Sequence, residues 1–442
     1  MPSQCASPAS PDVLAAVRPV QFLGAKTRSL PVLLEVLEDE LAAGAAVADV
    51  FSGSSVVSQG LARLGHVVSA YDALEHCAHF ARALLGVDRG DDEGPPRLEI
   101  RSADGEEGAW EPWLSLEREA IAAGDGEKLM ELSGTLPQVW RPEGATAELA
   151  GLFSRLAPGT RPSDGLVAAH YAGTYFGLGQ ALEIDLLRGA IDGGVEAGEI
   201  GDWEESLLIT ALLSAASDCA FSAGKHYAQP HRIREGKDLA FIRGRILEDR
   251  GKDLSALFES RLASLHASAL PEGGHSARAR TLEQLAGEPG ELDGVGAIYA
   301  DPPYTAQQYS RFYHVPEVID AYRVPALQRI SGTVTRGLYP EPAERHHSRF
   351  CSRREAPAAF ADLCRLAAGA DALLCLSYSF SRSGETGNRR SIDLPQLRQI
   401  VGEHFTAVTE KEIPLQYRQF NAGGNSVAGR SDGEILIVAK NR

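Results

Sequence analysis

The apolar positions near the start of the chain follow the periods of alternating strands and helices. Helical spacing predicts a helix over 30–43, and two short apolar runs, 46–51 and 66–71, are typical of buried strands. Residues 54–64 between these runs and 73–85 after them have helical spacing. This order of strand, helix, strand and helix predicts the opening of a doubly wound, Rossmann-like α/β domain.

The α/β rhythm is interrupted in the middle of the chain and then resumes. After a linker rich in Gly and Pro at 90–96, the pattern is largely helical as far as residue 289. Later elements are expected as strands at 295–300 and 372–378, a helix at 394–404, and a hairpin of 405–414 with 434–440. The predicted organisation is a disordered leader at 1–17, an α/β domain formed by 18–88 and 290–442, and a large, mainly helical insertion at 89–289.

Composition is that of an ordinary globular protein. The 442 residues are 44% hydrophobic and 23% charged, and this length suits about two or three domains. The six cysteines form no Cys-x-x-Cys pair, which argues against a zinc site and a disulfide framework. The chain has no apolar run long enough for a membrane span and no signal-peptide pattern. We therefore expect a cytoplasmic protein that binds no metal and no membrane.

The net charge of −17 is unevenly distributed. Residues 87–223 carry 9 basic and 26 acidic side chains, whereas 224–280 carry 11 and 7, and 301–442 carry 18 and 15. The excess of acidic residues therefore lies within 87–223, and the two later stretches, 224–280 and 301–442, are mildly basic. A phosphate backbone could contact these basic stretches, so the overall acidity does not exclude nucleic acid as a partner.

The tetrapeptide Asp301-Pro302-Pro303-Tyr304 follows the strand predicted at 295–300. A carboxylate accepts hydrogen bonds, and a rigid Pro-Pro turn can direct the carbonyl of Pro302 outward as a second acceptor. Tyr304 adds a ring that can stack on a planar heterocycle. The motif is therefore a candidate clamp for an exocyclic amino group such as N6 of adenine, and the plainer alternative is a turn that ends a strand. Aromatic residues that follow, from Tyr309 onward, could line a pocket for a base.

Three other segments carry candidate binding residues. After Asp49, the turn Phe51-Ser52-Gly53 leads from a strand into a helix whose free N–H groups can face a ligand. Asp72 ends the next strand, where a carboxylate can bind two ribose hydroxyls. Phe22 and Lys26 lie in a loop that could wrap a ligand's carboxylate. The plainer alternatives are a βα turn, a helix N-cap at Asp72 and a solvated lysine.

These motifs and their order resemble the alpha group of Dam-like, class I DNA adenine-N6 methyltransferases. The order is a lysine-bearing loop from Phe22 to Lys26, a donor-binding turn from Asp49 to Gly53, Asp72 after the second strand, an insertion, and the catalytic tetrapeptide. Segments around 307–317 and 434–439 also resemble this family, so the similarity extends over most of 20–440. Phe22 stands where the family often has Trp.

The resemblance implies S-adenosylmethionine as the methyl donor and an adenine flipped out of double-stranded DNA as the acceptor. Asp301 and the carbonyl of Pro302 would accept hydrogen bonds from N6, and Tyr304 would stack on the base. Asp72 would hold the donor's ribose, and Lys26 with its loop the methionine end. The implied donor-binding residues are Phe22, Lys26, Asp49, Phe51, Ser52, Gly53, Asp72 and Asp301.

Basic side chains are the candidates for contact with DNA. His346 and His347, which lie among some of them, are expected to be polar surface residues. Because the chain has no nuclease motif, it is expected to act alone or with a restriction or defence-system partner. The predicted DNA-binding residues are Lys225, Arg232, Arg234, Arg243 and Arg245 in the insertion, and Arg349 and Arg353, beside Arg336, Arg345 and Arg354, in the later part.

Three alternatives stay open on the sequence. The same tetrapeptide can serve N4 of cytosine, so the chain could be a cytosine-N4 methyltransferase. It could also be a non-catalytic DNA-binding component of a defence system on this fold. An RNA methyltransferase is the third, because an acidic insertion is unusual for a protein that reads duplex DNA.

Overall fold

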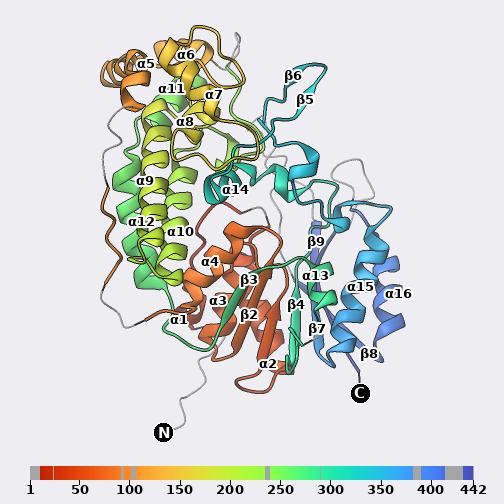
Figure 1. Cartoon of the computed structure of the whole chain (residues 1–442). Coiled ribbons are helices and arrows are strands. Elements are labelled where there is room, and N and C mark those ends of the chain that lie inside the picture. Colours follow the sequence, from red (N-terminus) through yellow and green to blue (C-terminus); the bar gives the residue numbers. More distant parts are fainter. Residues whose placement is uncertain are drawn as a thin grey trace.

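The computed structural model describes residues 10–22, 24–90, 94–100, 106–233, 239–288, 290–381, 390–413 and 432–441. These residues form an α/β structure with a seven-stranded, mostly parallel sheet below a large group of helices (Figure 1). Its strands are β1 (Ala46–Asp49), β2 (Val67–Asp72), β3 (Ser276–Ala279), β4 (Ala297–Ala300), β7 (Leu373–Ser381), β8 (Ala407–Ile413) and β9 (Asp432–Lys440).

The strand order in the sheet is β3-β2-β1-β4-β7-β9-β8. β1 pairs in parallel with β2 on one side and with β4 on the other, while β9 runs antiparallel to both of its neighbours. The chain leaves β1 toward β2 and β3 and later returns to β4 on the opposite side. The sheet therefore has a switch point between β1 and β4, the position where doubly wound sheets bind ligands beyond the carboxyl ends of their strands.

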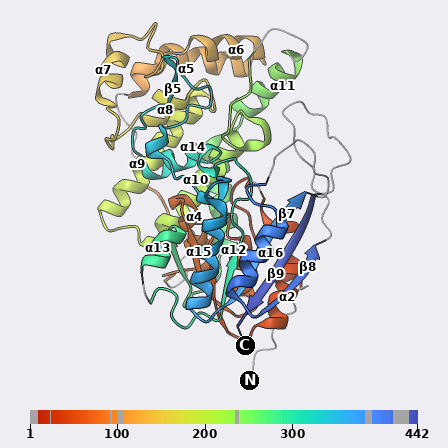
Figure 2. The same ribbon diagram turned by 90° about the vertical axis from the view of Figure 1, so that its right-hand side faces the viewer.

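The central strands read as near-continuous apolar runs because both faces of the sheet are buried. One face packs against α2 (Leu30–Glu40) and α3 (Val56–Arg63), through Val47, Tyr299 and Leu436 among others. The other face packs against α13 (Leu282–Gly287), α15 (Ala356–Gly369) and α16 (Leu394–His404). Figure 2 shows α15 and α16 covering this second face. The expected α/β class with helices on both faces is confirmed.

The remaining helices form the upper group in Figure 1, and most of them lie between α4 (Glu75–Leu85) and β3 in the chain. Their apolar core is continuous with Phe80 of α4 and Val315 of α14 (His314–Ala321). These helices are α5 (Glu106–Ala122), α6 (Gly126–Thr135), α7 (Ala147–Arg155), α8 (Leu166–Tyr171), α9 (Leu178–Glu196), α10 (Asp202–Cys219), α11 (Leu239–Arg250) and α12 (Leu254–Ser268).

Two local features differ from the sequence predictions. β3 lies inside 89–289, the range expected to be a mainly helical insertion, so the sheet resumes at Ser276. This edge strand was not predicted because only Ala277 of its four residues is buried. In the leader, residues 1–9 lie outside the described residues, but α1 (Pro11–Leu14) is helical. Ser10 accepts a hydrogen bond from the N–H of Val13 at 3.3 Å, and the side chain of Val13 is buried against the core.

The short hairpin of β5 (Arg329–Ile330) and β6 (Thr333–Val334) rises above α14 (Figure 1). In the part of the chain that the structure describes, no helix is both long and apolar enough to cross a membrane. Those residues also contain no cluster of three or more His, Cys, Asp or Glu side chains with metal-binding geometry.

A substitution at Gly86 can test how closely the end of α4 packs against the chain near Leu270. Gly86 ends α4 with φ +66°, and a Cβ there would lie 2.1 Å from the carbonyl oxygen of Leu270. We expect Gly86→Ala to lower the free energy of unfolding by about 3 kcal/mol, from backbone strain plus this clash. Gly44 has a similar φ of +73° and open space, so Gly44→Ala should cost only about 1 kcal/mol. Urea unfolding would measure both; equal losses would contradict the clash.

Candidate functional site

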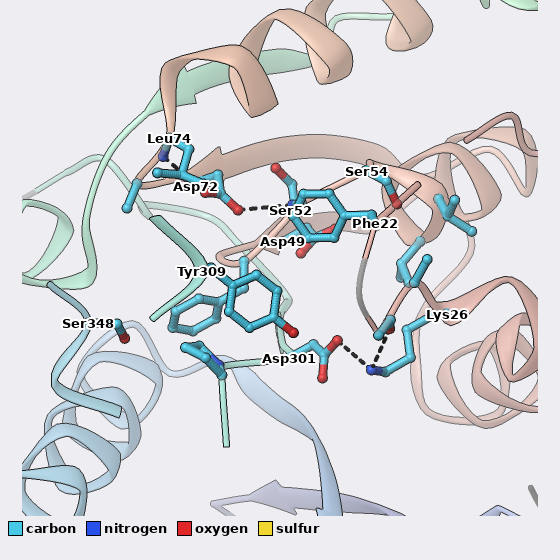
Figure 3. Close-up of a pocket in the computed structure, with 18 of the residues that line it drawn as sticks. Phe22, Lys26, Asp49, Ser52, Ser54, Asp72, Leu74, Asp301, Tyr309 and Ser348 are labelled. Atoms are coloured by element: carbon cyan, nitrogen blue, oxygen red, sulfur yellow. Dashed lines mark hydrogen bonds and ion pairs between the residues drawn. The ribbon is translucent and has the colours of Figure 1, made fainter. Parts of the chain in front are cut away.

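A pocket opens at the carboxyl edge of the sheet, at the switch point between β1 and β4 (Figure 3). The space between its walls, counted together with the open mouth, is about 820 Å³. The loop before α2, the turn after β1, the end of β2 and the segment after β4 form its wall. Residues on that wall include Phe22, Lys26, Asp49, Phe51, Ser52, Gly53, Asp72, Pro303, Gln308 and Tyr309, with Asp301 at the end of β4.

Lys26 lies between two carboxylates. Its ammonium group forms an ion pair with Asp301 Oδ2 and lies 3.5 Å from Oε1 of Glu434 in β9. The side chains of Lys26 and Glu434 are only 5% and 1% exposed, and Ser377 of β7 donates a hydrogen bond to Glu434 at 2.7 Å. Lys26 therefore fixes the position of Asp301, and its contact with a ligand's carboxylate, the role expected from the sequence, stays a prediction.

Asp301 keeps one oxygen for other partners. Its Oδ2 is engaged by Lys26, whereas Oδ1 is buried and accepts no hydrogen bond. Burial raises the pKa of Asp301 to about 6, although the positive charge of Lys26 acts in the opposite direction. At neutral pH the side chain is thus an ionised acceptor in the wall of the pocket, and a donor N–H group would satisfy it.

Asp49 presents a second buried acceptor. Ser58 donates a hydrogen bond to its Oδ2 at 2.6 Å, and Oδ1 has no partner. Burial raises the pKa of Asp49 to about 7. The hydroxyl groups of Ser52 and Tyr299, which also line the pocket, are buried without partners. Because buried polar atoms are nearly always hydrogen-bonded, this group of unpaired atoms indicates a site built for a polar ligand.

Asp72 both shapes the wall and faces the cavity. Its two carboxylate oxygens accept hydrogen bonds from the backbone N–H groups of Gly53 at 2.9 Å and Leu74 at 3.0 Å. Each oxygen retains a further lone pair for a ligand hydroxyl. Burial raises the pKa of Asp72. The capping and ligand-binding interpretations of Asp72 are therefore compatible.

Gly53 allows an aromatic ring to cover the turn after β1. It adopts φ +49°, and a Cβ would lie 2.9 Å from the ring of Phe22. Phe22 stacks on Tyr313 with centroids 4.5 Å apart and lies 5.9 Å from Tyr309. The rings of Phe22 and Tyr309 stand on the front side of the pocket in Figure 3.

The tetrapeptide is divided between the pocket and the core. Pro303 lines the pocket, and Pro302 is buried. The ring of Tyr304, outside this lining, is covered by the guanidinium of Arg390 at 4.8 Å and meets Tyr378 edge-on at 5.9 Å. The aromatic residues that line the cavity are instead Phe22, Phe51, Tyr299 and Tyr309.

Several pocket residues were not identified from the sequence. His346 was expected on the surface, but it is half-buried and lines the pocket, and burial lowers its pKa. Ser348 lies beside it and exchanges two hydrogen bonds with the side chain of Gln308, at 2.9 and 3.1 Å. Glu434, the second partner of Lys26, could have been found from the sequence. It directly precedes the apolar run 435–439, and a carboxylate in that position suggests a buried ion pair.

The predicted DNA-binding residues differ in exposure and in their partners, and their contact with DNA stays a prediction. Arg232, Arg353 and Arg354 are exposed, and Arg234 lies outside the described residues. Arg336 and Arg345 donate hydrogen bonds to uncharged oxygens. The rest are held in ion pairs: Lys225 with Asp249, Arg243 with Glu127, Arg245 with Glu248 and Asp249, and Arg349 with Asp362.

No family model matches the chain, and no curated protein or solved structure shows significant similarity to it. The chemistry of the pocket must therefore support any functional assignment. Three carboxylates, Asp49, Asp72 and Asp301, surround it together with the single ammonium of Lys26. This excess of negative charge favours a ligand that is cationic and rich in hydrogen-bond donors.

Removal of Lys26 should make stability depend on pH. In a Lys26→Met variant the pKa of Asp301 rises above its present value of about 6, whereas an unfolded aspartate ionises near pH ~4. The folded state then binds more protons than the unfolded state in this interval, so stability falls as pH rises through it. We expect losses of about 3 kcal/mol at pH 8 and clearly less at pH 5.

Urea unfolding at the two pH values would measure this effect. The double variant with Asp301→Asn serves as the control, because it removes the unpaired charge and should recover part of the loss at pH 8. A loss of the same size at both pH values would contradict the ion pair.

Proposed function

We propose that the protein transfers the methyl group of S-adenosylmethionine to N6 of an adenine flipped out of DNA. One observation carries the proposal. At the carboxyl end of β4, Asp301 lines the pocket, is held by Lys26 through one oxygen, and has its other oxygen buried and without a hydrogen-bond partner among the described residues. A carboxylate prepared in this way suits an exocyclic amino group, and the proline turn beside it supplies the second acceptor.

The charge of the pocket supports this methyl donor over other nucleotide cofactors. A dinucleotide would bring two phosphates against Asp49 and Asp72, which is electrostatically unfavourable. S-adenosylmethionine instead brings a positive sulfonium, an ammonium group and two ribose hydroxyls. When bound, it supplies a methyl group that is open to direct displacement.

The donor-side residues would then have separate roles. Asp49 Oδ1, buried and unpaired, would accept hydrogen bonds from the ammonium group. Asp72 would accept from the ribose hydroxyls while it keeps its bonds to the backbone of Gly53 and Leu74. Lys26 would act through Asp301, beside the role that the sequence implied for it.

On the acceptor side the base must leave the helical stack, because N6 cannot be reached within the duplex. Asp301 Oδ1 and the carbonyl of Pro302 would accept hydrogen bonds from the two N–H groups of N6 and direct the nitrogen lone pair at the methyl carbon; after transfer the nitrogen loses one proton. Tyr309 and Phe22 provide aromatic faces in the wall of the pocket. Orientation and exclusion of water supply the acceleration, and no covalent bond to the protein is needed.

Product analysis tests the proposal. After incubation with labelled S-adenosylmethionine and duplex DNA, digestion to nucleosides should yield N6-methyladenine. We expect Asp301→Ala to lower the rate of methyl transfer at least about 100-fold, because it removes an acceptor formed for the transition state. Its affinity for DNA should stay within about twofold of wild type.

Asp293→Ala is the matched control, since Asp293 lies exposed before β4 and should retain full activity. N4-methylcytosine as the only product, or methylation of RNA alone, would contradict the proposal. So would an Asp301→Ala variant that is as active as wild type.

Donor binding should depend on pH through Asp49. Because burial raises the pKa of Asp49 to about 7, a cationic ligand must displace a proton below that pH. Affinity for S-adenosylmethionine should therefore rise about fivefold to tenfold between pH ~5.5 and ~6.5 and level off above pH ~7. Calorimetric titration would measure it. Asp49→Asn should bind weakly and lose most of the pH dependence; an unchanged profile in that variant would contradict the role of Asp49.

A further inference from the structure

Two arginines lie over the ring of one buried tyrosine. The guanidinium carbon of Arg311 is 4.6 Å from the ring centroid of Tyr339, and that of Arg345 is 5.7 Å away. Arg311 is exposed, and Arg345 is half-buried. The ring thus holds two positive charges near each other, close enough for Arg311 to act on Arg345.

No carboxylate compensates these charges among the residues that the structure describes. The guanidinium group of Arg311 makes no hydrogen bond or ion pair there, and that of Arg345 donates to the uncharged Pro340 O at 2.9 Å and Gln328 Oε1 at 3.3 Å. Glu344, next to Arg345 in the chain, accepts a bond from the backbone of Ala326 at 2.9 Å instead. Burial and the charge of Arg311 both lower the pKa of Arg345. An anion between the guanidinium groups would remove this repulsion.

The tyrosine that carries the pair is held firmly. Tyr339 is 5% exposed, its hydroxyl group donates to the carbonyl oxygen of Ala228, and its ring meets His314 edge-on at 5.2 Å. A Cβ at Gly337 would lie 2.3 Å from the ring, so a side chain at that position would displace it. The two arginines therefore rest on a preformed support, which reduces the entropy lost when they bind a ligand.

Both arginines are next in the chain to residues that line the pocket. Arg311 directly follows Tyr309 and Ser310, and Arg345 directly precedes His346, all three of which line the cavity. Figure 1 shows the segment from α14 through β5 and β6 beyond the carboxyl edge of the sheet, between the upper helices and α15. A group bound by both arginines would thus sit beside any base that enters the pocket.

We propose that Arg311 and Arg345 form a clamp for one phosphodiester group of the DNA strand that presents the target base. Guanidinium groups match the planar geometry of phosphate oxygens, and phosphate contacts set the position of a protein on DNA. The inference rests on the proposed function, because it assigns the backbone contact next to the base that would be methylated. Arg349, Arg243 and Arg245, which the sequence favoured for this role, are occupied by carboxylates.

The salt dependence of DNA binding tests the clamp. Fluorescence anisotropy with a labelled duplex of mixed sequence would give the slope of log Kd against log salt between about 50 and 200 mM. Arg311→Gln and Arg345→Gln should each lower this slope by about 0.9, with weaker binding at every salt concentration. Arg311→Lys should keep the wild-type slope, since it keeps the charge at an exposed position.

Arg398→Gln is the matched control, because it removes the same charge from an exposed arginine paired with Glu410, and it should bind as wild type. Urea midpoints equal to wild type for the Gln variants would confirm that they fold. Unchanged slopes in both Gln variants, or a lowered slope only with duplex RNA, would overturn the clamp. Lowered slopes without any methylated nucleoside would support the clamp and reject the proposed function. Methylated adenine together with unchanged slopes would support the proposed function and reject the clamp.

Discussion

The candidate site depends on the ammonium group of Lys26 between Asp301 and Glu434. These three residues come from the loop before α2, the end of β4 and the antiparallel strand β9, and Lys26 and Asp301 are 275 positions apart. Two buried carboxylates in one place would repel each other without a cation. The ion pair therefore holds the loop against the sheet and leaves the second oxygen of Asp301 without a hydrogen-bond partner among the described residues, with Phe22 of the same loop over Gly53.

Charge is separated across the site in a way that the net value of −17 conceals. Carboxylates surround the pocket, whereas Arg311 and Arg345, next in the chain to lining residues, have no carboxylate partner among the described residues. We expect a cationic ligand inside and an anionic strand at the mouth. The two charge distributions fit the proposed function together, because the interior repels a polyanion that the arginines attract but does not repel an uncharged base.

Most of the α/β framework follows from local patterns. The apolar runs that became β1, β2, β4 and β7 were predicted because strands buried on both faces read as continuous hydrophobic segments. β3 was missed because an edge strand buries few side chains and leaves no such run. His346 and Gln308 were missed for a related reason: they lie in irregular segments, where no periodicity marks which side chains face a cavity.

The sequence by itself determined the α/β class, the order of the candidate motifs and the residue types at Asp49, Asp72 and Asp301, because strands and βα turns are specified by neighbouring residues. Only the tertiary structure decided how charges pair. It assigned Lys26 to Asp301 and left Arg311 and Arg345 without a carboxylate. Electrostatic partners are chosen by distance in space, and residues far apart in the chain become neighbours only after the sheet and helices have packed.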